Sequence, residues 1–146
     1  MKTSLNGINF IKRHEGLRLE SYKCPAGKWT IGYGHTLGVT ADLTITNDEA
    51  GDLLKLDIER CERAINRYDL KLKQCEFDAL ISFIFNVGIG AFMTSTLLMH
   101  LLMNYSNDLI VKQLGRWIYV NGQVNEVLKK RRKAEIQVYL YGNYNS

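Results

Sequence analysis

The amino-acid sequence predicts an α+β fold in which one small β-hairpin is combined with several helices. Residues 17–33 show a strand, turn, strand pattern around the turn signal Pro25-Ala26-Gly27. Residues 46–65 repeat apolar side chains at helical spacing. The chain has 146 residues, of which 46% are hydrophobic and only one is proline. Residues 1–146 are therefore predicted to form a single domain with one core and no linker or repeat.

A short amphipathic helix is expected before the hairpin. Apolar residues at positions 8, 10 and 11 supply one face, and the helix is expected to start near Ser4 or Asn6 and to close on His14-Glu15-Gly16. Glu15 would then stand at the end of a helix, next to the hairpin.

An acid, a thiol and a hydroxyl are spaced around this hairpin. Cys24 and Thr30 flank the turn, so their side chains can approach each other, while Glu15 faces them from the helix end. Gly32 and Gly34 leave room for a backbone or a substrate to come close. The spacing predicts that the three groups converge on one cleft.

A long helix is predicted after the hairpin. Thr46 followed three residues later by Glu49 is a capping-box sequence. The apolar face comprises Ala50, Leu53, Leu54, Ile58, Cys61 and Ile65, and the polar face Asp52, Lys55, Glu59, Glu62 and Arg63. This helix is interpreted as a connection between two parts of the fold, without a chemical role.

Residues 79–107 contain no Lys, Arg, Asp or Glu, and such a length raises the question of a membrane span. Polar residues interrupt the stretch, and Gly88-Ile89-Gly90 is expected to divide it into two helices of about ten residues each. Because such lengths are typical of a globular core, no stable membrane insertion is expected. The expected core residues are Leu80, Ile84, Val87, Phe92, Leu97, Leu98 and Leu101.

A last helix is expected from about Gln123 to Leu140. Its apolar residues are Val124, Val127, Leu128, Ile136 and Leu140, and they flank five consecutive cations at positions 129–133. This basic run has two interpretations, a solvated helix face or a functional cluster.

The net charge of +4 and the pI near 9.0 favour an anionic partner without choosing among nucleic acid, a membrane surface and peptidoglycan. The sequence contains no motif typical of nucleic-acid binding, so no nucleic acid is expected. It also has no zinc-ligand spacing and no phosphate loop, so no metal and no cofactor are expected. The first residues lack the apolar core of a signal peptide, which predicts a cytoplasmic chain with reduced cysteines.

The chain resembles the phage-type lysozymes, the endolysin family also known as glycoside hydrolase family 24. The family pattern is a Glu, eight residues, an Asp or Cys, five residues and a Thr, and Glu15, Cys24 and Thr30 match it without an insertion. Further similar strings follow in order: Gly32-Tyr33-Gly34-His35-Thr36, Phe85-Asn86-Val87-Gly88, Gly90-Ala91-Phe92 and Arg131-Arg132-Lys133-Ala134-Glu135. Two positions depart from the commonest pattern: Cys24, where many members have Asp, and Val127, where the counterpart is often Gly.

The resemblance implies a lysozyme-like, two-lobed single domain. A small N-terminal β-hairpin lobe and a larger helical lobe would be joined by the long helix, with the substrate cleft between them. The implied reaction is hydrolysis of the β-1,4 bond between N-acetylmuramic acid and N-acetylglucosamine in peptidoglycan. Glu15 would protonate the leaving oxygen, kept protonated near neutral pH by partial burial against Leu19, Phe85 or other apolar groups.

Three roles remain open for Cys24: a thiolate base that activates water, a nucleophile, or a passive wall beside a water held by Thr30. The relatives invert configuration, and inversion needs a gap of about 6.5–9.5 Å for water between the two groups. The base or water-positioning role is therefore favoured. Cys61 and Cys75 are expected to be small buried hydrophobes.

Five further residues are expected to bind substrate or to tune Glu15: His35, Thr36, Phe85, Asn86 and Arg131. His35 has a structural hydrogen bond as an equal alternative, and Phe85 and Asn86 have ordinary packing and capping. Arg131 by its position would reach the cleft near Glu15, while the neighbouring cations attract an anionic cell wall.

The resemblance also implies a biological role, lysis of the host bacterium at the end of a phage infection. The protein would be a monomer in the host cytoplasm, released by a separate holin to cleave glycan strands in the periplasm. Two alternatives stay open: a lytic transglycosylase on the same substrate, and a non-catalytic cationic protein that disrupts membranes through residues 129–133 and the adjacent apolar face. Anhydro-muramic products would indicate the first, and lysis by a Glu15→Gln variant the second.

Overall fold

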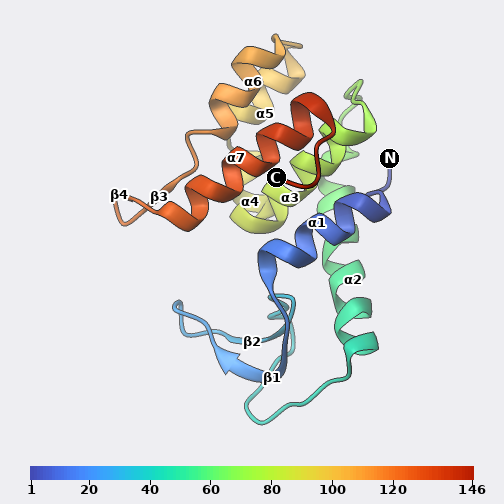
Figure 1. Cartoon of the computed structure of the whole chain (residues 1–146), viewed down its shortest axis with the longest axis vertical. Coiled ribbons are helices and arrows are strands. Elements are labelled where there is room, and N and C mark those ends of the chain that lie inside the picture. The colour runs from blue at the N-terminus through green and yellow to red at the C-terminus, as the bar shows by residue number, and fades with distance from the viewer.

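The computed structural model describes all residues from Met1 to Ser146, and they form seven helices and four short strands. Their bounds are α1 Leu5–Glu15, β1 Arg18–Lys23, β2 Trp29–Gly32, α2 Asn47–Ile65, α3 Gln74–Val87, α4 Ile89–Met93, α5 Thr96–Leu102, α6 Asn107–Leu114, β3 Tyr119–Val120, β4 Gln123–Val124 and α7 Glu126–Tyr141. The hairpin β1–β2 lies at one end of the molecule, most helices gather at the other, and α2 extends between the two (Figure 1). This is the predicted α+β architecture of two lobes joined by a long helix.

The hairpin lobe is built from backbone hydrogen bonds and few buried side chains. Strands β1 and β2 are antiparallel, with Tyr22 opposite Thr30. At the turn, the Gly27 N–H donates to the Cys24 carbonyl over 2.8 Å, and Gly27 has a φ of 79°, which favours glycine. The segment before α2 pairs with β1 through the Ser21 N–H, which donates to the Leu43 carbonyl over 2.9 Å. The lobe therefore depends on its turns for shape.

The predicted starts of α1 and α2 are confirmed. The Ser4 side chain caps α1, and Thr46 and Glu49 form the predicted capping box of α2. One assignment on α2 is wrong, because Glu62 was placed on the solvent-facing side and is only 5% exposed. Its carboxylate accepts hydrogen bonds from the backbone and the hydroxyl of Thr3 over 2.6 and 2.7 Å, since the N-terminal segment folds over this end of α2.

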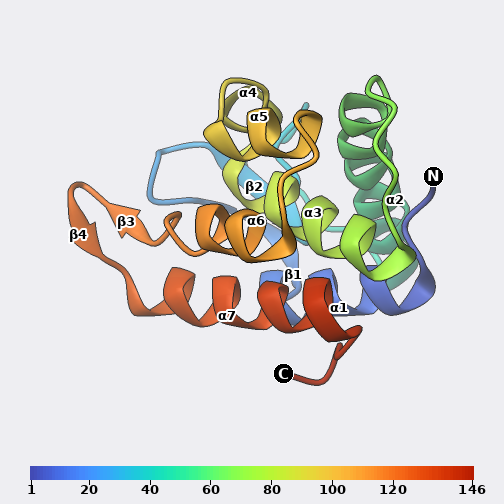
Figure 2. The same ribbon diagram turned by 90° about the horizontal axis from the view of Figure 1, so that it is seen from above.

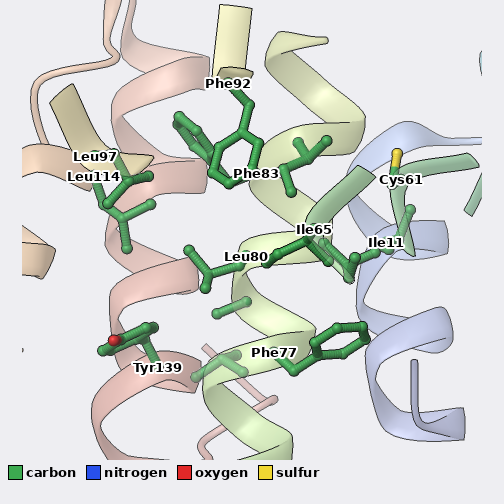
Figure 3. Close-up of a cluster of buried hydrophobic side chains, with 14 of the residues drawn as sticks. Ile11, Cys61, Ile65, Phe77, Leu80, Phe83, Phe92, Leu97, Leu114 and Tyr139 are labelled. Atoms are coloured by element: carbon green, nitrogen blue, oxygen red, sulfur yellow. The ribbon is translucent and has the colours of Figure 1, made fainter. Parts of the chain in front are cut away.

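The core surrounds α3, the central helix of the larger lobe. Figure 2 shows α3 with α2, α1 and α7 placed around it. Leu80 and Phe83 project from α3 into a cluster that also contains Ile11, Ile65 and Tyr139 (Figure 3). Six of the seven predicted core residues are buried and Val87 is half-buried. The burial of α3 on several sides explains its nearly continuous apolar sequence.

The division of residues 79–107 differs in part from the prediction. The break at Gly88 is confirmed, and its φ of 96° favours glycine. However, the first helix already begins at Gln74, and two short helices, α4 and α5, replace the expected second one. Ser95 caps α5 by accepting from the Leu98 N–H over 3.1 Å, so a local cap divides the apolar run. No helix of the structure combines the length and the apolar character needed to cross a membrane.

The predicted start of the last helix is wrong. Residues 123 and 124 form β4, and α7 begins only at Glu126, where the Asn125 side chain accepts from the Leu128 N–H over 3.0 Å. Strands β3 and β4 are joined through Asn121 and Gly122, which have φ angles of 50° and 78°. An Asn-Gly pair with two positive φ angles is typical of a two-residue hairpin turn, a signal that the helical interpretation overlooked.

Candidate active site

Glu15 is the last residue of α1, as predicted, and Gly16 ends the helix with a φ of 67°. The Glu15 carboxylate accepts a hydrogen bond from the Arg131 guanidinium on α7 and forms an ion pair with it. The side chains of Glu15 and Arg131 are 18% and 5% exposed. Glu15 is therefore partly buried, as expected, and its polar partner is a cation.

Arg131 belongs to a buried charged network that fixes its position. Its Nε and Nη2 donate to Glu135 over 3.2 Å and to the Ser82 carbonyl over 3.1 Å. Glu135 is fully buried and also pairs with Arg132 over 2.9 Å, while Arg132 donates to the Asn86 side chain over 2.6 Å. Burial raises the pKa of Glu135, and the two guanidiniums oppose this shift. Glu135 lies between the two arginines, and Glu15 is the second acidic side chain that contacts Arg131.

The basic run at 129–133 is thus divided between the interior and the surface. Arg131 and Arg132 are 4% and 1% exposed, whereas Lys130 and Lys133 face solvent. The interpretation of the whole run as a solvated face is wrong for the two arginines, because helical spacing directs them toward α3 and its partners.

The hairpin turn brings Cys24 and Thr30 together around the backbone of Lys28. The Cys24 N–H and the Thr30 hydroxyl donate to the Lys28 carbonyl over 2.9 and 3.0 Å. Thr30 is buried and Cys24 is half-exposed. The backbone N–H groups of Lys28 and Ala26 lower the pKa of the Cys24 thiol by stabilising the thiolate. The turn therefore favours a reactive sulfur.

A cleft of about 450 Å³ separates the hairpin lobe from the helical lobe. It is lined by Lys28, Gly34, Thr36, Leu37, Asp57, Arg60, Cys61, Ile84, Phe85, Gly88, Ile89 and Gly90. A Cβ atom added to Gly34 would lie 3.5 Å from Oε2 of Glu15. The carboxylate therefore lies at the edge of this cleft, where Gly34 leaves it accessible.

The remaining predicted site residues differ in what they can contact. The two ring nitrogens of His35 lie 2.8 Å from the Asp57 carboxylate and 2.9 Å from the Leu37 carbonyl, so this buried side chain has the structural role. Thr36 and Phe85 line the cleft. Asn86 accepts from Arg132 and lines a neighbouring groove beside β3.

Three residues that hold the site were not singled out from the sequence: Asp57, Ser82 and Glu135. Asp57 ties the hairpin lobe to α2 through His35, and the Ser82 hydroxyl donates to Glu135 over 2.8 Å. The Asp57–His35 and Ser82–Glu135 pairs join residues 22 and 53 positions apart, so no local pattern indicates these two pairs. No group of three His, Cys, Asp or Glu side chains is placed to hold a metal ion.

A carboxylate at the edge of a cleft between two lobes can serve as the general acid of a glycosidase. The comparisons with known proteins agree. The model of the phage lysozyme family matches residues 12–135, a range that includes every residue of the candidate site. The chain belongs to this family.

Individual relatives extend the similarity to nearly the whole chain. The endolysin of Acyrthosiphon pisum secondary endosymbiont phage 1 is 40% identical over 141 residues, which cover 92% of this chain and 95% of the relative. The endolysin of Salmonella phage P22 is 38% identical over 147 residues, covering 96% and 99%. The solved structure of an endolysin from Escherichia coli O157:H7 phage FAHEc1 has a TM-score of 0.88 at 34% identity, covering 100% of this chain and 98% of that one.

Proposed function

We propose that the protein hydrolyses the β-1,4 bond between N-acetylmuramic acid and N-acetylglucosamine in peptidoglycan, with Glu15 as the general acid. The observation that carries this proposal is the place of the Glu15 carboxylate at the edge of the cleft, held by Arg131. Arg131 is itself fixed by Ser82 and Glu135. An acid must be oriented toward the glycosidic oxygen to be effective, and this chain of contacts supplies the orientation.

We propose that the Cys24 thiolate activates the attacking water and that the Thr30 hydroxyl positions it. The lowered pKa of Cys24 increases the fraction of thiolate that can accept a proton from water. The Thr30 hydroxyl, which already donates to the Lys28 carbonyl, retains lone pairs that can accept a hydrogen bond from the same water. In this scheme the thiolate replaces the carboxylate that many relatives have at this position.

The decisive experiment digests purified peptidoglycan with the wild type and with Glu15→Gln and Cys24→Ala variants, and identifies the fragments by mass. We expect new reducing ends from the wild type, a loss of about a thousandfold in rate for Glu15→Gln and about a hundredfold for Cys24→Ala. Glu20→Gln, an exposed residue of β1, is the matched control. Full activity of Cys24→Ala would show the thiol to be dispensable.

The same digestion separates the alternative functions. Anhydro-muramic ends would indicate a lytic transglycosylase, a possibility that the non-carboxylate at position 24 keeps open. Lysis of cells by Glu15→Gln would indicate membrane disruption. The structure disfavours the second alternative, because Ala134 and Val138 on the apolar side of α7 are buried in the core.

In the cell, we propose that residues 1–146 act as one monomeric catalytic domain that lyses the host bacterium after a separate holin opens a path from the cytoplasm to the periplasm. The expected outcome is that cells expressing the protein alone keep growing and lyse when a holin is co-expressed. Glu15→Gln with the same holin should leave the wall intact. Turbidity of the culture measures both results.

A further inference from the structure

Two cations without an acidic partner line the cleft. Lys28 and Arg60 are exposed side chains of its lining, and neither forms an ion pair in the structure. The carboxylate that lines the cleft, Asp57, is bonded to His35, and Glu15 at the edge is bonded to Arg131. The acidic groups of the cleft are thus engaged, and two positive charges remain available to a ligand.

These cations stand on two different elements that line the cleft. Lys28 ends the turn of the hairpin, and its carbonyl receives the hydrogen bonds of Cys24 and Thr30. Arg60 stands on α2, three residues after Asp57. Phe85 and the Gly88–Gly90 segment line the cleft from the helical lobe and carry no charge. Any anionic group of a bound glycan would therefore be attracted to the hairpin turn and to α2.

We propose that Lys28 and Arg60 form a carboxylate-binding subsite that recognises the acidic peptide stems of the glycan strand. This inference rests on the proposed function. The N-acetylated sugars of the strand are uncharged, so the carboxylates of the stems are the groups that ammonium and guanidinium side chains can select. The subsite makes the enzyme prefer strands whose stems carry free carboxylates over strands whose stems are amidated.

The test compares two substrates: purified peptidoglycan, and the same material with its carboxylates converted chemically to carboxamides. The enzymes are the wild type, Lys28→Gln, Arg60→Gln and the double variant. Lys23→Gln on β1 and Arg63→Gln on α2 are the matched controls, because they remove the same charge from the same elements at exposed positions outside the cleft lining. Cosedimentation with each substrate measures binding independently of turnover.

We expect amidation to lower kcat/KM of the wild type about tenfold, mainly through KM. The double variant should lose about tenfold on untreated peptidoglycan and show nearly equal kcat/KM on the two substrates. Arg60→Lys should keep the preference, and both controls should behave as the wild type. Salt should reduce the preference of the wild type, because the subsite is open to solvent.

Two results would overturn the subsite while leaving the proposed function intact. One is a double variant that discriminates between the substrates as well as the wild type does. The other is an equal loss of discrimination in Lys23→Gln and Arg63→Gln, which would assign the preference to overall charge. Failure of the wild type to release fragments from either substrate would overturn the proposed function itself, and the subsite with it.

Discussion

In the helical lobe, Arg131 is held by a fully buried carboxylate, Glu135, whereas in the hairpin lobe Cys24 and Thr30 are both held by one backbone carbonyl, that of Lys28. The helical lobe therefore positions Arg131 through a buried ion pair, whereas the hairpin lobe positions Cys24 and Thr30 through hydrogen bonds to a backbone carbonyl. Buried charges tolerate no change of partner, since an unpaired charge in the interior is strongly destabilising. The Lys28 carbonyl accepts from the backbone N–H of residue 24, and this bond does not require a particular side chain there.

This difference explains where the chemistry of the site can vary. On the hairpin, the bond from the Cys24 N–H to the Lys28 carbonyl does not depend on the side chain at position 24. On α7, the side chains of Arg131, Arg132 and Glu135 depend on one another. We expect substitutions among Arg131, Arg132 and Glu135 to alter stability and a substitution of Cys24 to alter activity.

The largest loss of stability is expected for Glu135→Gln. This change leaves the Arg131 and Arg132 guanidiniums buried without their shared carboxylate and should lower the free energy of unfolding by about 3–5 kcal/mol. Urea denaturation followed by circular dichroism measures the loss. Glu126→Gln, an exposed residue at the start of the same helix, should change the free energy by about 0.5 kcal/mol or less. Equal losses of unfolding free energy in Glu135→Gln and Glu126→Gln would show that the buried network does not contribute more to stability than an exposed charge on the same helix.

A large effect on activity alone is expected from alkylation of Cys24. Iodoacetamide should modify this half-exposed thiol with its lowered pKa at neutral pH and reduce the rate about a hundredfold, with the fold intact. Cys61 is an internal control, because burial raises the pKa of its thiol to about 12. Peptide mapping should find the label on Cys24. Full activity of the labelled protein would remove Cys24 from the mechanism.

A smaller loss of stability is expected when the contact between the two lobes is removed. His35→Asn removes the bond to Asp57 that ties the hairpin lobe to α2 and should cost about 1–2 kcal/mol. Asp57→Asn is the partner variant, and the double variant completes a thermodynamic cycle. A coupling energy near zero would show that the pair does not hold the lobes together.

The smallest expected effect is a change of stability with pH that is caused by His14, the residue before Glu15 on α1. Burial and the nearby cations Arg131 and Arg13 lower the pKa of His14 to about 4. Between pH 6.5 and 4 the unfolded chain therefore binds a proton that the folded chain does not. Stability is complete above pH 6.5 and falls by about 1 kcal/mol toward pH 4, a value reduced for the half-exposed ring. Thermal unfolding of the wild type and His14→Gln at pH 7 and 4 should show a smaller fall in the variant.

Capping residues and turn residues correctly predicted where the first helices and the hairpin turn lie. Ser4 and Gly16 bound α1, the Thr46–Glu49 box starts α2, and Pro25-Ala26-Gly27 marks the turn that joins β1 and β2. Predictions failed where two signals competed. The apolar pattern was extended back to Gln123, although Asn121-Gly122 and the Asn125 cap set the boundary at Glu126.

By itself, the sequence determined which elements form and which chemical groups stand near the hairpin, because caps, turns and apolar periods act over a few residues. The spacing of Glu15, Cys24 and Thr30 belongs to this information. The resemblance placed Arg131 near Glu15, but only the tertiary structure decided which side chains bond to which. The contacts between Glu15 and Arg131 and between His35 and Asp57 join residues 116 and 22 positions apart. Which charges become buried together depends on how the helices pack, and that packing is a property of the whole core.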